Sequence, residues 1–461
     1  MEAPFDIAAD LDTPVSAYLK LQAFKPCFLL ESVEGGERLA RYSFLGLGAA
    51  LTLELRPDTL RINGEATPRP ESGSAWLDTL RGTLAASPEL KPSIDGMPFA
   101  GGLVGATGYD VVRYFERLPE NQAELDGLPQ AAYVAPESLL IFDHLTRRVA
   151  LLHSGTEAER QALRREVIQA LRQGIDERTA QRSFSEAEAS LSRAEFTAAV
   201  EQCKAHITAG DIYQIVLSVR FSGTADLDPF QCYRALRLLN PSPYMYFLKL
   251  DDLMVAGSSP EALVRLDGRN ASLSPIAGTR PRGRTSEEDL ALEKELLDDP
   301  KENAEHVMLV DLARNDLGRV ASAGSVHVSP YRIIERYSHV MHIVSGVRGE
   351  VVADKDAADL FAATFPAGTL VGAPKVRAME LIAEMEPVGR GLYGGTVGYF
   401  AKNGNMDQAI TIRTVVFNGR EYSFQAGAGI VADSDPEREY EEVLAKSAIL
   451  RRALEIAEEG L

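Results

Sequence analysis

Cysteine is scarce in this sequence, and its scarcity narrows the possible classes of protein. Only Cys27, Cys203 and Cys232 occur in 461 residues, and they are widely spaced. An odd number of scattered thiols supplies neither a disulfide framework nor the clustered ligands of a zinc site. Apolar runs long enough to span a membrane are also lacking, and the acidic first residues, MEAPFDIAADLD, contain no signal-peptide core. We therefore expect a cytoplasmic protein without a membrane partner.

Positive charge is in short supply as well. Lys and Arg number 48 against 67 Asp and Glu, which gives a net charge of −19. This balance argues against a surface for nucleic acid or for an anionic membrane. A small anionic substrate remains compatible with it, because a metal ion and a few arginines can reverse the field inside one site.

Strand-like and helix-like segments alternate along two regions of the chain. In residues 1–180 the runs FLLESV, YSFLGLG, LTLEL and LLIFDH indicate short strands, and residues 157–175 have helical apolar spacing. The polar stretch 176–190 is a candidate linker to a second region, residues 190–461. There, Ser192 and Glu195 form a capping box for a helix that ends at Gly210. The pattern predicts an α+β fold with large, mostly antiparallel sheets.

Two pairs of glutamates share a helical spacing although they lie far apart in the sequence. Glu302 and Glu305 form one pair, Glu439 and Glu442 the other, and Lys446 follows the second pair by four residues. Residues three apart project from one helix face, so each helix can present two carboxylates together. If both helices faced one pocket, the repulsion would call for a cation, and an all-oxygen shell suits Mg²⁺. The same spacing also occurs on ordinary solvated helix faces.

Three glycine-containing segments are candidate anion-binding loops. SPIAGTRPRGR (274–284) combines Gly278 and Thr279 with three arginines, and TFPAGTLVGAPK runs into a helix whose free N–H groups can bind an anion. QAGAGIVADSDPERE leads into the second acidic helix, with Ser434 or Asp435 as its cap. AITIRTVVF reads as an apolar strand, and an arginine inside such a strand, Arg413, needs a polar partner. None of the three segments fits a phosphate-loop or dinucleotide fingerprint.

Long motifs in a fixed order identify a resemblance that covers nearly the whole chain. In the second half they are SPIAGTRPRG, DPKENAEHVMLVDLARNDLGRV, SHVMHIVSGV, TFPAGTLVGAPK, QAITIRT and GAGIVADSDPEREYEEVLAKS, and in the first half LLESVEGGERLARYSFLG and GGLVGATGYDVVRYFERLP. By these motifs the chain resembles the chorismate-utilising enzymes, most closely the large subunits of anthranilate synthases. The resemblance implies two mostly antiparallel sheets packed as a sandwich, flanked by helices, with the active site in a cleft.

The resemblance also implies a metal and a set of catalytic groups. Mg²⁺ would hold the ring carboxylate of chorismate, with Glu305 and Glu442 as its ligands. Glu302 and Glu439 would be second acidic groups, one of which helps the 4-hydroxyl to leave. His342 matches the family's active-site histidine, which acts on the leaving hydroxyl or orients the ring.

For the substrate, the resemblance implies that Tyr393 and Arg413 hold the enolpyruvyl carboxylate, with Arg413 in the bidentate mode that a guanidinium favours. It groups Thr369 with the catalytic residues in the same pocket. The other residues implied to line this pocket are Gly278, Thr279, Gly427, Ala428, Gly429 and Lys446.

Two positions distinguish reactions within the family. Enzymes similar to aminodeoxychorismate synthase often carry a lysine nucleophile where this chain has Ala277. Isochorismate and salicylate synthases place a lysine base where it has Gln214. Both substitutions favour direct attack of ammonia at ring C2 and loss of pyruvate, which yields anthranilate. Aminodeoxychorismate synthase stays open as an alternative, since some members lack the lysine, and so does a catalytically silent subunit that binds tryptophan.

The resemblance further implies a tryptophan feedback site and a partner subunit. LLES and NPSPYM match the inhibitor site, although a proline-rich turn needs no ligand. The cysteines lie outside any Gly-x-Cys-x-Gly turn of the glutaminase type, so we expect a separate glutamine amidotransferase subunit to supply ammonia in a hetero-oligomer. The residues assigned to the inhibitor site are Glu31, Ser32, Pro241, Pro243, Tyr244 and Met245.

Overall fold

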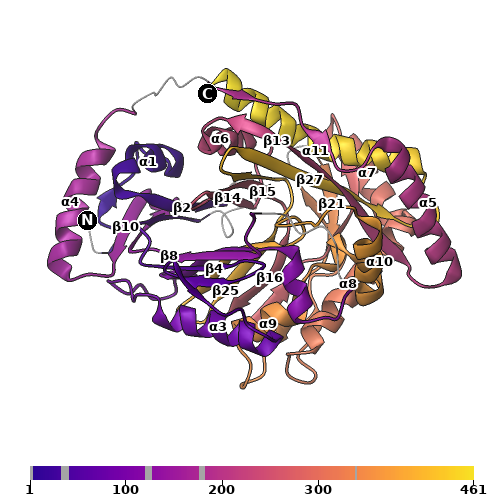
Figure 1. Cartoon of the computed structure of the whole chain (residues 1–461), viewed down its shortest axis with the longest axis horizontal. Coiled ribbons are helices and arrows are strands. Elements are labelled where there is room, and N and C mark those ends of the chain that lie inside the picture. Colours follow the sequence, from indigo (N-terminus) through magenta and orange to yellow (C-terminus); the bar gives the residue numbers. More distant parts are fainter. Residues whose placement is uncertain (1–3, 33–40, 120–126, 176–181, 338–339) are drawn as a thin grey trace.

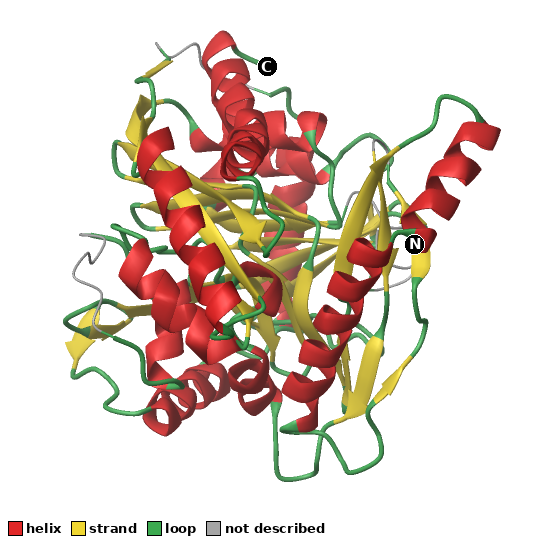
Figure 2. Ribbon diagram, turned by 90° about the vertical axis from the view of Figure 1, so that its right-hand side faces the viewer, coloured by secondary structure: helices red, strands yellow, loops and turns green. Residues whose placement is uncertain are grey.

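Two large antiparallel sheets lie one above the other, and helices cover their outer faces (Figures 1 and 2). The computed structural model describes residues 4–32, 41–119, 127–175, 182–337 and 340–461. In these residues every ladder within the two large sheets is antiparallel. The predicted α+β sandwich with flanking helices is confirmed.

The first sheet contains thirteen strands among the described residues. A long pairing near one end of this sheet joins β13 to β27, where Leu217 lies opposite Ala428 and Ser218 opposite Gly427. Small β12 and β23 pair with β13 beside the main path. Along the main path the order is β1 (Ile7–Ala8), β10 (Arg148–His153), β9 (Ser138–Asp143), β3 (Tyr42–Leu47), β2 (Pro26–Glu31), β14 (Tyr244–Leu250), β15 (Leu253–Ser259), β26 (Thr414–Asn418), β27 (Glu421–Ile430), β13 (Gln214–Asp226) and β11 (Ser183–Phe184), with β12 at Glu188–Ala189 and β23 at Gly372–Ala373.

The second sheet contains eleven strands among the described residues, and a three-stranded sheet lies beside it. The order in the second sheet is β19 (His327–Val328), β22 (Val347–Glu350), β17 (Asn270–Leu273), β16 (Ala262–Asp267), β25 (Met406–Ile410), β24 (Thr396–Ala401), β7 (Gly102–Thr107), β8 (Ala131–Ala135), β4 (Leu51–Leu55), β5 (Leu60–Ile62) and β6 (Glu65–Thr67). The small sheet has the order β18 (Ile276–Pro281), β21 (Val340–Val344) and β20 (Ile333–Arg336).

Helices pack on both outer faces of the sandwich. In Figure 1, α6 and α11 lie above the first sheet, whereas α3 and α9 lie below the second. Helix α8 packs on β18 and β22, and α10 packs on β13. The helices are α1 (Pro14–Lys20), α3 (Gly73–Ala86), α4 (Glu157–Leu171), α5 (Arg193–Ala209), α6 (Pro229–Leu239), α7 (Ser286–Asp298), α8 (Pro300–Gly318), α9 (Ala357–Thr364), α10 (Lys375–Met385) and α11 (Pro436–Glu459), with single 3₁₀ turns η1 (Gln22–Phe24), η2 (Tyr109–Tyr114) and η3 (Gly368–Leu370).

Several helix ends lie where their capping residues predict. The Ser192 side chain accepts a hydrogen bond from the Glu195 backbone N–H, and α5 ends at Gly210 in a left-handed conformation. Asp435 caps α11 and Pro436 occupies its first turn. The charged segment predicted as a helix forms α4. Capping satisfies backbone groups that the helix leaves free, which is why these short patterns fix the boundaries.

Both large sheets contain strands from both halves of the chain. In the first sheet β2 pairs with β14, and in the second sheet β7 pairs with β24. The division into residues 1–180 and 190–461 remains a prediction, and residues 176–181 of the predicted linker lie outside the described residues. Because strands from the two halves share hydrogen bonds, each large sheet is built jointly by both halves of the chain.

Two local predictions were wrong. AITIRTVVF is interrupted: β25 ends at Ile410 in the second sheet, β26 begins at Thr414 in the first, and Arg413 between them has φ 49°. A left-handed residue turns the chain from one sheet to the other, which apolar alternation alone does not reveal. Residues 276–281, predicted as a loop, form β18, with a register shift beside Gly278 at φ 71°. Such a register shift is a β-bulge, and a bulge accommodates a glycine in the left-handed conformation within a strand.

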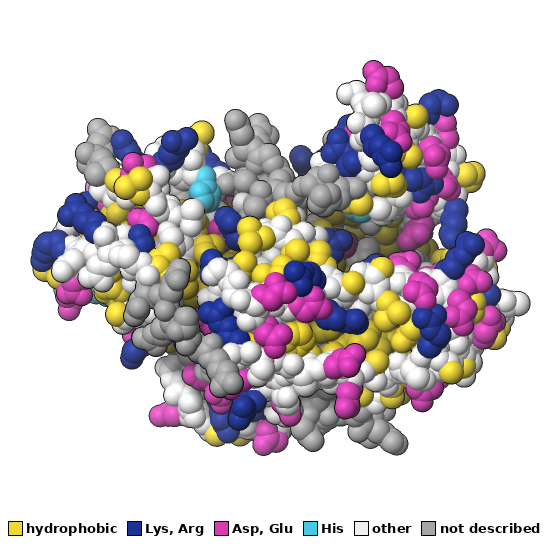
Figure 3. Space-filling view, turned by 90° about the horizontal axis from the view of Figure 1, so that it is seen from above, with side chains coloured by type: hydrophobic (Ala, Val, Ile, Leu, Met, Phe, Trp, Pro, Cys, Tyr) yellow, Lys and Arg dark blue, Asp and Glu magenta, His cyan; other side chains and the backbone are white. Residues whose placement is uncertain are grey.

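In Figure 3 acidic and basic side chains intermingle over the face seen from above, so the side chains coloured there form no continuous basic surface. Among the described residues, every helix is too short or too polar to cross a membrane.

Candidate active site

A cavity of about 710 Å³ opens beside β27 and β13, toward one end of the first sheet. Its walls come from β13, β18, β21, α8, η3, β27 and α11, together with the turn that contains Arg413. Except for Ala428, every residue assigned to the substrate or metal site lines this cavity. The Ala428 side chain is completely buried on the other face of β27, so only its backbone remains available for the predicted role.

The two acidic helices face this one cavity, which the glutamate spacing alone could not show. Glu302 and Glu305 project from α8, and Glu439 and Glu442 project from α11. Burial raises the pKa of Glu305 and of Glu439, and in each case the charge of Glu442 raises it further. The site therefore disfavours a full set of negative charges without a cation.

Basic side chains neutralise the other two carboxylates. Lys446 Nζ lies 2.7 Å from Glu442 Oε1, and Arg280 Nη1 lies 3.2 Å from Glu302 Oε1. The described residues contain no group of three or more acidic, histidine or cysteine side chains close enough to enclose a metal. The donor set nevertheless fits Mg²⁺, which is commonly held by one or two carboxylates, substrate oxygens and water. It fits a dedicated protein cage for Ca²⁺ or zinc less well.

The His342 side chain is held in one orientation by β18. Its Nδ1 lies 2.9 Å from the Gly278 carbonyl oxygen and 3.1 Å from Thr279 Oγ1. A carbonyl only accepts, so Nδ1 carries the proton and Nε2 is left as an acceptor. Burial lowers the pKa of His342. A neutral imidazole follows, which can accept a proton or orient a ligand but is a poor proton donor.

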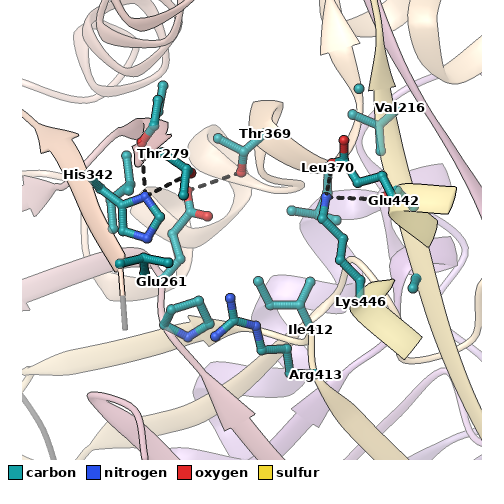
Figure 4. A pocket seen from close by; sticks show the side chains of 18 of the residues that line it. Val216, Glu261, Thr279, His342, Thr369, Leu370, Ile412, Arg413, Glu442 and Lys446 are labelled. Carbon is teal, nitrogen blue, oxygen red and sulfur yellow. Dashed lines mark hydrogen bonds and ion pairs between the residues drawn. The ribbon is translucent and has the colours of Figure 1, made fainter. Parts of the chain in front are cut away.

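A carboxyl that sequence analysis missed also lines the cavity. Glu261 lies in the tight connection between β15 and β16, and its Oε1 accepts a hydrogen bond of 3.1 Å from the Thr369 hydroxyl (Figure 4). Burial raises the pKa of Glu261 to about 7. This carboxyl is therefore about half protonated at neutral pH, where an ordinary glutamate is ionised. In the sequence, Glu261 stands out only as part of a Pro-Glu pair between two apolar strands, and such pairs are too common to indicate a functional residue.

The labelled side chains surround the cavity from different directions. In Figure 4, His342 and Thr279 lie on one side and the Glu442–Lys446 pair on the opposite side, with the Thr369–Glu261 pair between them. Arg413 enters from the connection between the two sheets, and its Nη1 donates a 3.2 Å hydrogen bond to Asn240 Oδ1. A cation held by the acidic groups and the guanidinium of Arg413, at separate positions, can bind two anionic groups of a small ligand in one orientation.

Two close contacts, one with the backbone of β13 and one with Tyr393, explain why position 427 is a glycine. A Cβ atom at Gly427 would lie 2.8 Å from the Tyr393 hydroxyl oxygen and 2.7 Å from the Leu217 carbonyl oxygen. A side chain there would push the tyrosine out of place. The glycine thus allows the hydroxyl to approach the backbone of β27 inside the cavity.

The two positions that distinguish reactions both lie in the cavity wall. Ala277 is buried and brings no amine into the cavity. Gln214 Nε2 donates a 3.2 Å hydrogen bond to Glu305 Oε1. Neither residue can act as a covalent nucleophile or as a strong base.

A second, smaller cavity of about 120 Å³ lies between the two large sheets. Its walls include five of the six residues assigned to the inhibitor site, namely Glu31, Ser32, Pro243, Tyr244 and Met245. Pro241 instead lines the large cavity, and Pro243 lines both cavities. The proline turn before β14 therefore separates the two cavities.

Polar groups in the smaller cavity are fixed by charged partners. Glu31 is salt-bridged to Arg237 at 3.1 Å and also accepts a hydrogen bond from Tyr233. The Tyr244 hydroxyl donates to Asp407 at 3.0 Å, and Ser32 Oγ is buried without a partner among the described residues. An unpartnered buried hydroxyl beside a cavity is a position at which a ligand can bind.

A sandwich of antiparallel sheets with an acid-lined cavity defines the class of this protein. The chain belongs to the chorismate binding enzyme family, whose profile matches residues 25–452. Among its relatives, anthranilate synthase component 1 of Thermus thermophilus is 47% identical over 98% of this chain and 97% of its own length. The corresponding protein of Cereibacter sphaeroides is 48% identical over 98% of this chain and 94% of its own.

Solved structures show the same relationship. Anthranilate synthase component I from Streptococcus pneumoniae superposes with a TM-score of 0.80 at 33% identity, covering 98% of this chain and 100% of that chain. The menaquinone-specific isochorismate synthase from Escherichia coli has a TM-score of 0.72 at 19% identity, covering 96% of this chain and 92% of its own, which shows the shared fold alone.

Proposed function

We propose that this chain converts chorismate and ammonia into anthranilate, pyruvate and water. The proposal is carried by the full-length similarity to proteins named anthranilate synthase component 1. It is supported by the neutral side chains of Ala277 and Gln214 in the cavity wall. Without a lysine at either position, ammonia itself is the nucleophile.

In the proposed reaction, the ammonia nitrogen bonds to ring C2 as the bond from C4 to its hydroxyl breaks. The departing oxygen takes a proton and leaves as water. Loss of the C2 hydrogen and of the enolpyruvyl group, as pyruvate, then makes the ring aromatic. The first step needs a proton donor that is still protonated at neutral pH.

We assign this proton transfer to Glu261 rather than to Glu302 or Glu439. Its pKa of about 7 leaves a substantial protonated fraction at neutral pH. The Thr369 hydroxyl holds the carboxyl toward the cavity. Neutral His342 has Nε2 as an acceptor and so suits orientation of the ring or removal of a proton.

For the metal, Glu305 and Glu442 remain the proposed ligands of Mg²⁺. When bound, Mg²⁺ would neutralise the ring carboxylate of chorismate and hold it in place. The raised pKa of Glu305 and the position of both residues in the cavity wall support a cation at this point. Arg413 and Tyr393 would then bind the enolpyruvyl carboxylate.

Ammonia is proposed to come from a separate glutamine amidotransferase subunit. The test is a nitrogen-source comparison on the purified chain with chorismate and Mg²⁺. Ammonium at alkaline pH should support turnover by the chain alone, whereas glutamine should do so only after the amidotransferase is added. Turnover of glutamine by the chain alone would refute the division of labour.

We further propose that the smaller cavity binds tryptophan as a feedback inhibitor. Its position between the sheets and its shared wall at Pro243 support this role. A ligand there would contact β2 and β14 of the first sheet and β24 and β25 of the second. Such a ligand can alter how the sheets pack, and through the proline turn it can alter the substrate cavity.

A further inference from the structure

A deeply buried ion pair lies directly behind one wall of the substrate cavity. Glu386 follows α10, Arg390 lies four residues later, and they are 4% and 3% exposed. Arg390 Nε and Nη2 donate to the two carboxylate oxygens of Glu386 at 2.8 and 2.7 Å. This is the fork geometry in which a guanidinium and a carboxylate bind most strongly.

The remaining contacts of the pair reach the cavity wall itself. Arg390 Nη1 donates to the Leu370 carbonyl at 2.7 Å, and Nη2 donates to the Val216 carbonyl at 2.8 Å. Leu370 and Val216 both line the cavity, one from η3 and the other from β13. One guanidinium therefore ties together two segments that are distant in sequence.

Glu386 extends the connection to a third segment. Its Oε1 accepts hydrogen bonds from the Ser218 backbone N–H at 2.9 Å and from the Ser218 hydroxyl at 2.7 Å. The Ser218 hydroxyl in turn accepts a 2.8 Å hydrogen bond from Gln425 Nε2, and Gln425 lines the cavity from β27. Through Ser218, the Glu386 carboxylate therefore fixes the Gln425 side chain, with which it makes no direct hydrogen bond.

Tyr393 also rests on the pair. The Arg390 guanidinium carbon lies 5.7 Å from the centre of the Tyr393 ring and 4.9 Å from that of Tyr109. Behind Tyr393, a small void of about 20 Å³ is lined by Arg390 and Gln425 among others. The contact with the guanidinium is therefore one of the constraints on the position of the Tyr393 ring.

We propose that Glu386 and Arg390 act as a positioning pair for chorismate binding. The pair holds the wall formed by Val216, Leu370, Tyr393 and Gln425 so that it fits the enolpyruvyl side of the substrate. Stability alone does not require it, since apolar residues commonly replace a buried ion pair without loss. Directional bonds to two carbonyls and one amide instead fix where these segments lie. The inference deepens the proposed function, on which its assignment of the substrate rests.

The test uses Arg390→Lys and Glu386→Gln in the full chain, with Lys20→Met as the control. Lysine keeps the charge but lacks the planar fork, so it cannot serve Glu386 and both carbonyls together. Lys20, the last residue of α1, forms a partly buried ion pair with Asp12, and in Figure 1 α1 lies on the other side of the molecule from α10. Each variant is assayed well below its own Tm, so that nearly all molecules are folded.

Under these conditions, loss of folded enzyme lowers kcat, whereas a misplaced wall raises KM and the calorimetric Kd for chorismate. We expect Arg390→Lys and Glu386→Gln to raise both by about 10- to 100-fold, with the ammonium KM within about twofold of the original. Lys20→Met should change none of these. An unchanged chorismate Kd in either folded variant, or an equal rise in the ammonium KM, would overturn the proposal.

Measuring the Kd for chorismate keeps this test separate from the test of the proposed reaction. If the unmodified chain formed a product other than anthranilate, the proposed function would fail while the chorismate Kd still reported on the wall. If the chain made anthranilate and the variants bound chorismate normally, only the positioning role would fail. Should Arg390→Lys be insoluble, Glu386→Gln carries the same comparison with a nearly unchanged side-chain volume.

Discussion

At the scale of single residues, the cavity combines a carboxyl whose pKa is raised with an imidazole whose pKa is lowered. Burial raises the pKa of Glu261 to about 7 and lowers the pKa of His342. Opposite shifts of an acid and a base divide their roles near neutral pH. Glu261 is suited to give a proton to the leaving hydroxyl, and His342 is suited to accept one.

Replacing Glu261 by Gln should lower kcat by about 10²- to 10⁴-fold, because the proton donor is lost while the volume is kept. For the unmodified chain, the protonated fraction of Glu261 falls as pH rises through about 7. At a fixed concentration of free NH₃, the rate should therefore fall above pH 7, and this decline should vanish in the variant. A variant with the original kcat and pH profile would show that another group supplies the proton.

Gly427 offers a second residue-scale prediction. Gly427→Ala places a methyl group 2.8 Å from the Tyr393 hydroxyl oxygen and should weaken chorismate binding by about tenfold or more. The matched control is Gly82→Ala in α3, where an added Cβ meets nothing within 4 Å and gains up to about 1 kcal/mol of helix propensity. Calorimetric titration with chorismate measures both. Equal affinity in the two variants would contradict the close approach of Tyr393.

At the scale of elements, α8 and α11 together present the four glutamates. We expect Glu305→Gln or Glu442→Gln to abolish turnover and to weaken Mg²⁺ binding in the presence of chorismate, because each removes a proposed anionic ligand. Glu302→Gln and Glu439→Gln should lower the rate more than the metal affinity.

The control for these variants is a glutamate on α11 that lies outside the cavity. Glu441 is bound to Arg193 at 2.6 Å and lies outside the cavity, so Glu441→Gln should leave the Mg²⁺ dependence unchanged. Magnesium titrations of the initial rate make the comparison. If Glu305→Gln and Glu442→Gln kept the original Mg²⁺ dependence, the ligands would have to be sought elsewhere.

The elements also show how far the sequence could predict the structure. Helix caps such as Ser192 and Asp435 could be predicted from the sequence because each caps the helix that directly follows it. The break at Arg413 was not, since the choice between two sheets depends on strands that are distant in sequence. Sequence analysis missed Glu261 for a related reason. Its pKa is raised because surrounding segments bury it, and no local sequence pattern predicts that burial.

The glutamate pairs were predicted by spacing, but only the fold shows that both helices face one cavity. The resemblance supplied most other site residues, and the cavity wall contains nearly all of them. Glu386 and Arg390 stood in no motif that we had singled out. Their importance comes from carbonyls of β13 and η3 that the fold brings to the guanidinium.

At the scale of the whole molecule, both sheets combine strands from the two halves of the chain, and the smaller cavity lies between them. Tryptophan bound there should weaken chorismate binding by about 5- to 150-fold, and chorismate should weaken tryptophan binding by the same factor. Calorimetry with tryptophan, with and without chorismate and Mg²⁺, measures this coupling. Equal tryptophan affinity in both titrations, or no binding, would rule it out.

A substitution can locate the effect. Ser32→Phe should fill the smaller cavity of about 120 Å³ and remove inhibition by tryptophan, while leaving the uninhibited rate largely intact. Persistent inhibition in this variant would place the effector at another site.

The identity of the aromatic product tests the central claim most directly. The purified chain, given chorismate, Mg²⁺ and ¹⁵N-ammonium at alkaline pH, should release pyruvate and a labelled amine, to be identified by mass spectrometry and nitrogen NMR. We predict anthranilate, with the label on the ring carbon next to the carboxylate-bearing carbon. Formation of 4-amino-4-deoxychorismate, with no release of pyruvate, would contradict the proposed function.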